Sequence, residues 1–89
     1  MARMDLSTVE KAELVTQTGS SDALFELGML YSAGRDIETD FIEAHKWFNL
    51  AAMKGNREAL EYRLEISCEM SRSQIAKAQK SARRWLSNN

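Results

Sequence analysis

Gly28 interrupts a helical apolar pattern, and this glycine restricts the fold of the chain more than any other residue. Leu24, Leu27 and Tyr31 follow one another at helical spacing, so they share one face with Gly28 beside them. A glycine inside a helix costs about 1 kcal/mol relative to alanine. We therefore expect the backbone of a second helix to pack closely against Gly28.

The next apolar run supplies a matching helix. Ala44, Phe48 and Ala51 form a second stripe at helical spacing, and Trp47 adds a large side chain beside it. Large and small side chains would then alternate across a hairpin, which indicates a packing role for this whole stretch. The residues that we assign to this scaffold are Gly28, Tyr31, Gly34, Trp47, Phe48, Ala51 and Gly55.

Start and stop signals divide the chain, which contains no proline, into about five helices. Ser7, Asp40 and Ser71 each precede a Glu or Gln by three residues, which is the capping-box spacing. Ser20, Ser21 and Asp22 offer caps for a second helix, and Asn56 caps a fourth. Glycines suited to the left-handed conformation of helix ends follow at positions 19, 34 and 55. No segment alternates strictly between apolar and polar residues, so we predict no strand. We predict that the last helix faces the core with Ile75, Ala78, Ala82, Trp85 and Leu86.

Composition and length indicate one small domain, residues 1–89. The single cysteine, Cys68, excludes an internal disulfide and is too few for a metal cluster. Its spacing from Leu60 and Leu64 predicts a buried, inert thiol. The alternative is a redox-sensing thiol, since the cationic Arg72 follows one helical turn later. The N-terminus is charged where a secretory signal would be apolar, and no apolar run approaches the roughly 20 residues that span a bilayer. We expect a cytoplasmic protein that does not contact a membrane.

The stretch around Gly28 resembles known helical repeats. Tetratricopeptide-type repeats carry W-x2-L-G-x2-Y on one helix and A-x3-F on the next, and "LFELGMLY" and "AHKWF" fit this pattern with leucine in place of tryptophan. From Ala23 to Ala59 the chain is more specifically similar to the Sel-one-like repeat family. One departure is Asp36, which stands where that family usually has a second hinge glycine.

The resemblance implies an all-α fold, a short right-handed superhelix of helical hairpins. We assign the full repeat to residues 22–55 and an N-terminal capping helix to residues 7–19. The start of the repeat recurs at Ala59, 36 residues after Ala23, but its glycine and tyrosine do not. Residues 56–87 are therefore interpreted as a degenerate repeat and C-terminal cap.

The resemblance also implies a function. Such repeats act as scaffolds for complexes, so we expect a non-enzymatic adaptor, without a cofactor, that binds a peptide, another protein or itself. In tetratricopeptide-like repeats, positions of the first helix that face away from the hairpin line a peptide-binding surface. The corresponding residues are Asp22, Phe25, Met29 and Ser32. The alternatives are that the helix over residues 7–19 covers Phe25 and Met29, or that this patch forms a homodimer.

His45 is the only histidine, and we interpret it as a residue at the surface or at the edge of the apolar stripe. Its nearby carboxylates, Asp40 and Glu43, are assigned to helix capping rather than to a metal site. No nucleophile–base pair is evident, and a catalytic site needs several convergent groups. We therefore predict that the protein is not an enzyme.

Charge is distributed unevenly along the chain. Residues 1–70 carry seven Lys/Arg and thirteen Asp/Glu, whereas residues 71–89 carry five Lys/Arg and no acid. We interpret the basic face of the last helix as a solvated surface of the cap. An acidic protein partner or nucleic acid is the alternative, because clustered bases supply the sequence-independent part of phosphate binding. A small nucleic-acid-binding regulator is accordingly the alternative function.

Overall fold

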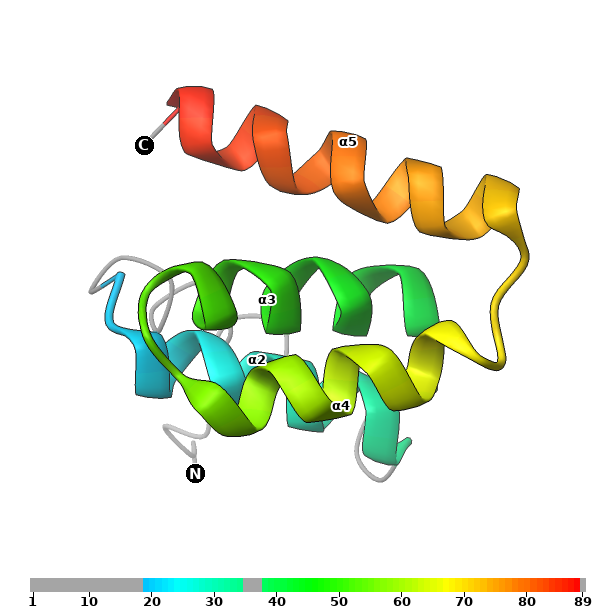
Figure 1. The fold of residues 1–89 in the computed structure, drawn as a ribbon, viewed down its shortest axis with the longest axis horizontal. Coiled ribbons are helices and arrows are strands. Elements are labelled where there is room, and N and C mark those ends of the chain that lie inside the picture. Colours follow the sequence, from blue (N-terminus) through cyan, green and yellow to red (C-terminus); the bar gives the residue numbers. More distant parts are fainter. Residues whose placement is uncertain (1–18, 35–37, 89) are drawn as a thin grey trace, which may run out of the picture.

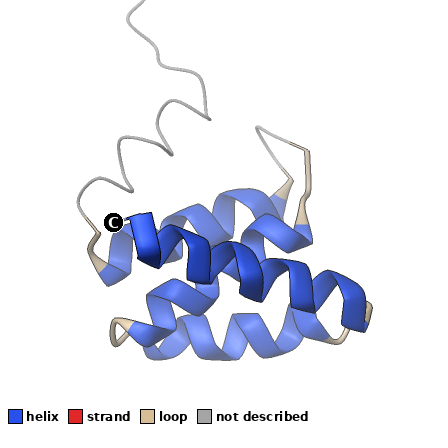
Figure 2. Ribbon diagram, turned by 90° about the horizontal axis from the view of Figure 1, so that it is seen from above, coloured by secondary structure: helices blue, strands red, loops and turns tan. Residues whose placement is uncertain are grey.

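The computed structural model of this protein describes residues 19–34 and 38–88. These residues form four α-helices, α2 (Ser21–Ala33), α3 (Phe41–Met53), α4 (Arg57–Ser67) and α5 (Arg72–Asn88). The loops between them are short, and no strand occurs in the described ranges (Figure 2). The all-α prediction is confirmed. The helix expected over residues 7–19 lies outside the described residues, so the five-helix superhelix stays a prediction.

Helix α3 lies at the centre of the arrangement. It packs against α2, α4 and α5, and these are the three principal helix interfaces of the described chain. Successive helices run antiparallel, and α5 lies along α3 on the side away from α2 and α4 (Figure 1). Helices α4 and α5 make few contacts with each other. The first pair is thus a closed hairpin, and the second pair is an open one.

The helices begin where the capping residues predicted. The Ser20 hydroxyl accepts from the amide of Ala23 at 3.1 Å, and the Asn56 side-chain oxygen accepts from the amide of Ala59 at 2.9 Å. At the start of α5 the capping box is reciprocal. The Ser71 hydroxyl accepts from the Gln74 amide at 3.1 Å, while the Gln74 side chain accepts from the Ser71 amide at 2.9 Å. These bonds satisfy amides that would otherwise lack partners at the helix ends.

The capping box predicted at Asp40 is only half formed. Asp40 Oδ1 accepts from the amides of Ile42 and Glu43, both at 3.1 Å, as expected of an N-cap. The Asp40 amide, however, donates to the carbonyl of Tyr31 at 3.0 Å, and the Glu43 carboxylate accepts from the Trp47 indole at 3.1 Å. The reciprocal half is absent because the α2 carbonyl already satisfies the Asp40 amide.

Gly28 has a packing role, as predicted, but its contact is a ring rather than a backbone. A Cβ at Gly28 would lie 2.5 Å from Cδ1 and Cε1 of Phe48. Phe48 is fully buried between α2 and α3, together with Leu24, Leu27 and Ala51. The close approach therefore places an aromatic ring on the helix surface where a side chain would otherwise lie. Tyr31, the last residue of the α2 stripe, is half-buried beside this core.

The ends of the repeat hairpin also follow the sequence prediction. Helix α2 ends at Gly34, with φ of 67° in the left-handed region. Helix α3 ends with Lys54 as its C-cap, and Gly55 follows with φ of 106°. Such φ values are costly for residues with a Cβ, which explains both glycines.

Helix α5 is held to α3 by one face. Ala78 and Ala82 are buried, and the rings of Trp85 and Trp47 meet edge to face with centroids 5.9 Å apart. The predicted inward face is thus confirmed for these residues. Leu86 was also expected to face the core, but 40% of it is exposed. A helix that packs against one neighbour instead of two covers only a narrow stripe, and Leu86 lies beyond its edge.

Candidate functional site

The residues predicted to bind a partner on α2 differ in their exposure and in their contacts. The Phe25 ring is half-buried, with centroids 5.7 Å from Phe48 and 5.6 Å from Tyr62 of α4. Tyr62 also stacks on Phe48, so that α2, α3 and α4 share one aromatic cluster. Helix α4 therefore covers part of Phe25. The cover that was expected from residues 7–19 lies outside the described residues.

The other three predicted residues are spread along α2. Asp22 is exposed and accepts from the Asn56 side-chain amide at 3.4 Å, a contact between the start of α2 and the start of α4. The Ser32 hydroxyl donates to the carbonyl of Met29 at 3.2 Å. Met29 is half-buried and packs against the core. Asp22 is exposed, whereas the other three are partly buried.

The expected surface position of His45 is wrong. The side chain is 3% exposed, because α4 lies over this part of α3. Nε2 lies 3.0 Å from the Ser67 hydroxyl, which itself donates to the carbonyl of Arg63 at 2.7 Å. A hydroxyl has one hydrogen, so it must accept from Nε2–H. The remaining nitrogen, Nδ1, is buried without a hydrogen-bond partner.

This environment favours a neutral imidazole. Burial lowers the pKa of His45 from its usual value, and the positive charge of Arg63 lowers it further. A neutral histidine bonded to Ser67 ties α3 to α4. Among the described residues, no group of three or more His, Cys, Asp or Glu side chains could hold a metal ion.

Helix α4 exposes the apolar side chains that sequence analysis placed inside. Cys68 is exposed, and its thiol lies 3.5 Å from the carbonyl of Leu64. Leu60 is 42% and Leu64 57% exposed. The three residues do share a stripe, as their spacing predicts, but α5 packs against α3 and leaves that stripe uncovered. The prediction of a buried thiol is therefore wrong.

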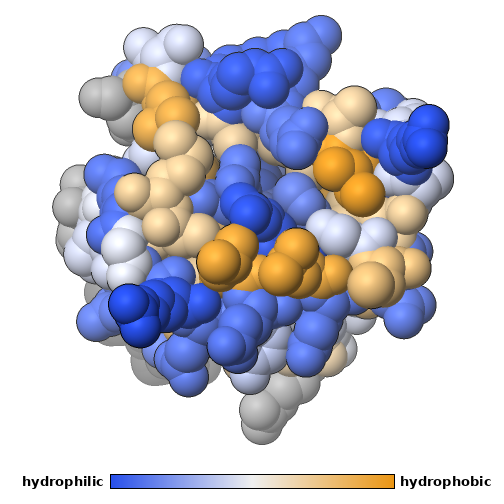
Figure 3. Space-filling model, in the orientation of Figure 1, coloured by the Kyte–Doolittle hydropathy of each residue, from blue (hydrophilic) through white to orange (hydrophobic). Residues whose placement is uncertain are grey.

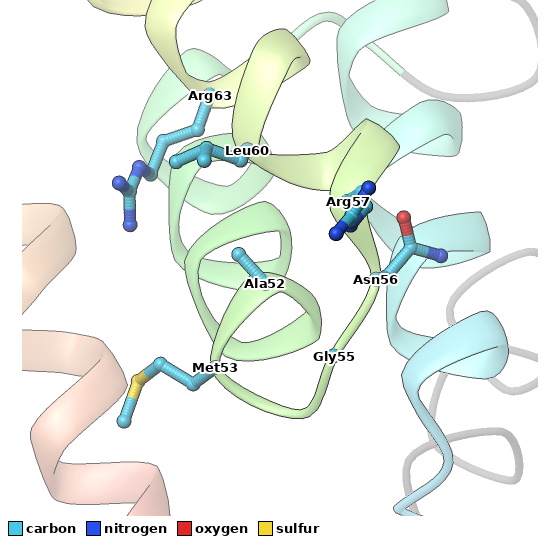
Figure 4. Close-up of a pocket in the computed structure, with 7 residues that line it drawn as sticks. All are labelled: Ala52, Met53, Gly55, Asn56, Arg57, Leu60 and Arg63. Atoms are coloured by element: carbon cyan, nitrogen blue, oxygen red, sulfur yellow. The ribbon is translucent and has the colours of Figure 1, made fainter.

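Further apolar side chains lie next to this stripe, at the turn between α3 and α4. Met53 is 61% exposed, and with Ala52 and Leu60 it lines an open pocket of about 390 Å³. The other lining residues are Gly55, Asn56, Arg57 and Arg63 (Figure 4). Figure 3 shows apolar side chains around a hollow on this face of the molecule, with polar side chains within it. We call Met53, Leu60 and Leu64 the α4 apolar surface.

The sequence did contain a signal for this surface. Helix α4 starts 36 residues after α2, and at this offset Leu64 stands in α4 where Gly28 stands in α2. A leucine leaves no room for a ring on α4, so the contact between Gly28 and Phe48 is not repeated there. The second pair of helices therefore cannot close as the first pair does.

The basic residues of α5 are all exposed. They are Arg72, Lys77, Lys80, Arg83 and Arg84. None of them forms an ion pair with a residue in the described ranges. The ion pair found there joins Lys46 to Glu43 within α3, at 3.4 Å. The basic face is therefore solvated in this structure, and its charge is available to a partner.

These observations define an all-α protein built on a closed helical hairpin, with an open second pair of helices. A comparison with protein-family models matches residues 21–56 to the Sel1 repeat. The chain therefore carries a Sel1 repeat, which comprises α2, α3 and the turn to Asn56, and the resemblance found in the sequence is confirmed. No curated protein and no solved structure matched the chain significantly. None of the described helices is sufficiently long and apolar to cross a membrane.

Proposed function

We propose that this chain is a non-enzymatic protein-interaction module that binds a peptide or a protein partner through its Sel1-repeat scaffold. The Sel1 repeat over residues 21–56 carries the proposal, since such repeats generally mediate protein interactions and are typically non-catalytic. Exposed large apolar side chains support it, because contiguous apolar surface on a small protein often marks an interaction site.

Two surfaces are candidates for this binding. The first is the α2 surface of Asp22, Phe25, Met29 and Ser32, which the repeat family implies. The second is the α4 apolar surface. A photo-crosslinking amino acid at position 22 or at position 64 reports on each separately, because both positions are exposed. Position 76, which is exposed on α5, serves as the matched control.

The experiment combines affinity capture of the tagged chain with sedimentation of the purified protein. We expect at least one protein partner, or self-association, and crosslinks from position 22 or 64 in preference to position 76. If the chain captures no protein and remains monomeric at high concentration, the proposed function is wrong.

Nucleic-acid binding through α5 is the alternative. The exposed Lys and Arg side chains of that helix, which form no ion pair with a described residue, favour it. Fluorescence anisotropy with RNA and DNA oligonucleotides at two salt concentrations tests it. Strong binding that weakens with salt and disappears when Lys80, Arg83 and Arg84 are replaced by alanine would support the alternative. Absence of binding at low salt would exclude it.

A further inference from the structure

We propose that the α4 apolar surface and its adjoining pocket bind an acidic amphipathic helix of a partner protein. This inference rests on the proposed function, and it names both the surface and the chemistry of the partner.

The first step is that none of the four described helices covers this surface. In the closed hairpin the Phe48 ring lies on Gly28 and buries the α2 stripe. Leu64, which stands in α4 where Gly28 stands in α2, leaves no room for such a ring. Leu60 and Leu64 therefore stay exposed one helical turn apart. Two apolar residues in line along a helix fit a second helix with apolar residues at the same spacing.

The second step concerns the charge around the pocket. Leu60 lies between Arg57 and Arg63 along α4, three residues from each (Figure 4). Neither arginine forms an ion pair with a described residue, and no carboxylate lines the pocket. Arg63 donates to the Asn49 side chain with one of its five N–H groups, so others remain available to an acceptor.

The third step is that the acidic residues of α4 lie on another flank. They are Glu58, Glu61 and Glu65, and their spacing of three and four residues places them on one stripe. At 100° per residue, the centre of that stripe lies on the far side of Leu64 from Leu60. The pocket side of α4 is therefore positively charged. Helix α5 adds five Lys or Arg residues and no Asp or Glu.

Together these features specify the occupant. An apolar side chain would enter the pocket against Met53 and Leu60, while carboxylates one turn away on either side would reach Arg57 and Arg63. Carboxylates suit this role because an arginine can donate two parallel hydrogen bonds to one carboxylate. A nucleic-acid backbone would neutralise the arginines but leave Leu60 and Leu64 without apolar contact.

The test uses two synthetic helical peptides of about four turns. Both carry leucine at positions i, i+4 and i+7. One carries glutamate and the other lysine on the flanking positions. Binding is measured by fluorescence anisotropy of the labelled peptide. We expect the glutamate peptide to bind at least about tenfold more tightly than the lysine peptide, a readily measured difference.

Three variants locate the binding surface. Changing Leu60 and Leu64 together to serine should weaken binding of the glutamate peptide about tenfold or more, because both apolar contacts are lost. Arg57→Glu should reduce the preference for the glutamate peptide. The control, Glu58→Ser with Glu65→Ser, alters the same helix outside the pocket and should leave affinity unchanged. All these positions are exposed, and circular dichroism confirms that each variant folds.

Four outcomes overturn the inference. The first is equal binding of the two peptides, and the second is binding that is insensitive to the leucine substitutions. The third is a dimer that the leucine substitutions abolish, which assigns the surface to a second copy of the chain. The fourth is displacement of the peptide by an RNA oligonucleotide whose own binding does not require the leucines.

Failure of this inference can be distinguished from failure of the proposed function. If a protein partner crosslinks from position 22 but not from position 64, the chain is an interaction module and the assignment of the surface is wrong. If no protein is captured and no peptide binds, both proposals are wrong.

Discussion

Replacing Gly28 by alanine adds a methyl group where the Phe48 ring now lies. The new carbon would lie 2.5 Å from Cδ1 and Cε1 and 2.9 Å from Cγ of the ring. Carbon atoms pack at about 3.5–4.0 Å, so the ring would have to move by about 1 Å. The ring cannot move into free space, because it is fully buried and contacts both Phe25 and Tyr62.

Two effects of opposite sign decide the outcome. Alanine in a helix interior is favoured over glycine by about 1 kcal/mol. Overpacking of a well-packed core costs about 1–3 kcal/mol, and the fully buried ring favours the upper part of that range. We expect Gly28→Ala to destabilise the protein by about 1–2 kcal/mol net. The melting temperature should fall by roughly 4–16 °C for a domain of this size.

Denaturant titration and thermal unfolding measure this change, and a double-mutant cycle identifies its cause. In a Phe48→Leu background the ring is absent, so Gly28→Ala should be neutral or stabilising. Ala76→Gly at an exposed position of α5 calibrates the helix-propensity term. If Gly28→Ala stabilises the wild-type protein, or if the cycle is additive, the ring contact does not explain the glycine. Gly28→Leu should cost more, about 2–4 kcal/mol.

Three further perturbations test other contacts. The pKa of His45 is lowered in the folded state, so the unfolded chain binds the proton more readily. Stability should therefore fall as the pH drops through 6.5 toward the lowered value. Unfolding of the wild type and of His45→Gln at pH 5 and 7.5 measures this, and an equal loss of stability in both proteins would contradict it. Asp40→Ala removes two hydrogen bonds at the start of α3 and should cost about 1 kcal/mol in chemical unfolding, with Asp40→Asn largely retaining them. Trp85→Ala should raise amide exchange in α5 more than in α2, because the contact with Trp47 holds α5 to α3; uniform acceleration would show that α5 does not open separately.

The elements were predictable because their signals are local. Capping by Ser20, Asn56 and Ser71 depends on residues within three positions of each helix start, and the structure contains each of these bonds. The same holds for the glycine that ends α2. The hairpin core was also predictable, because its two apolar stripes lie on consecutive helices and pair large side chains with small ones.

The burial of residues on α4 was not predictable from periodicity. A stripe such as Leu60, Leu64 and Cys68 shows that its members share a face, but it does not show whether another helix covers that face. Coverage depended on whether α5 would pack against α4 or α3. His45 illustrates the converse error. A polar residue at the edge of a stripe became buried because a later helix lies over it and supplies Ser67 as a hydrogen-bond partner.

The candidate site was likewise predictable only in part. The repeat pattern identified α2 positions whose equivalents bind ligands in related repeats, and Asp22 among them is exposed. The α4 apolar surface was missed because a degenerate repeat over residues 56–87 implies a second hairpin, whereas α5 packs against α3. The signal lies in the comparison of Gly28 with Leu64 at the equivalent position. Glycine leaves room for an aromatic ring of the next helix and leucine does not, although leucine is the more apolar residue.

The central position of α3 has a consequence for cooperativity. In a long solenoid each unit contacts only its neighbours, and stability is approximately a sum of nearest-neighbour terms. Here α5 packs against α3, two helices earlier in the chain, rather than against α4. Because all three principal interfaces of the described helices meet on α3, damage to α3 weakens all of them together. Loss of α5, in contrast, would leave the interfaces of α3 with α2 and α4 in place.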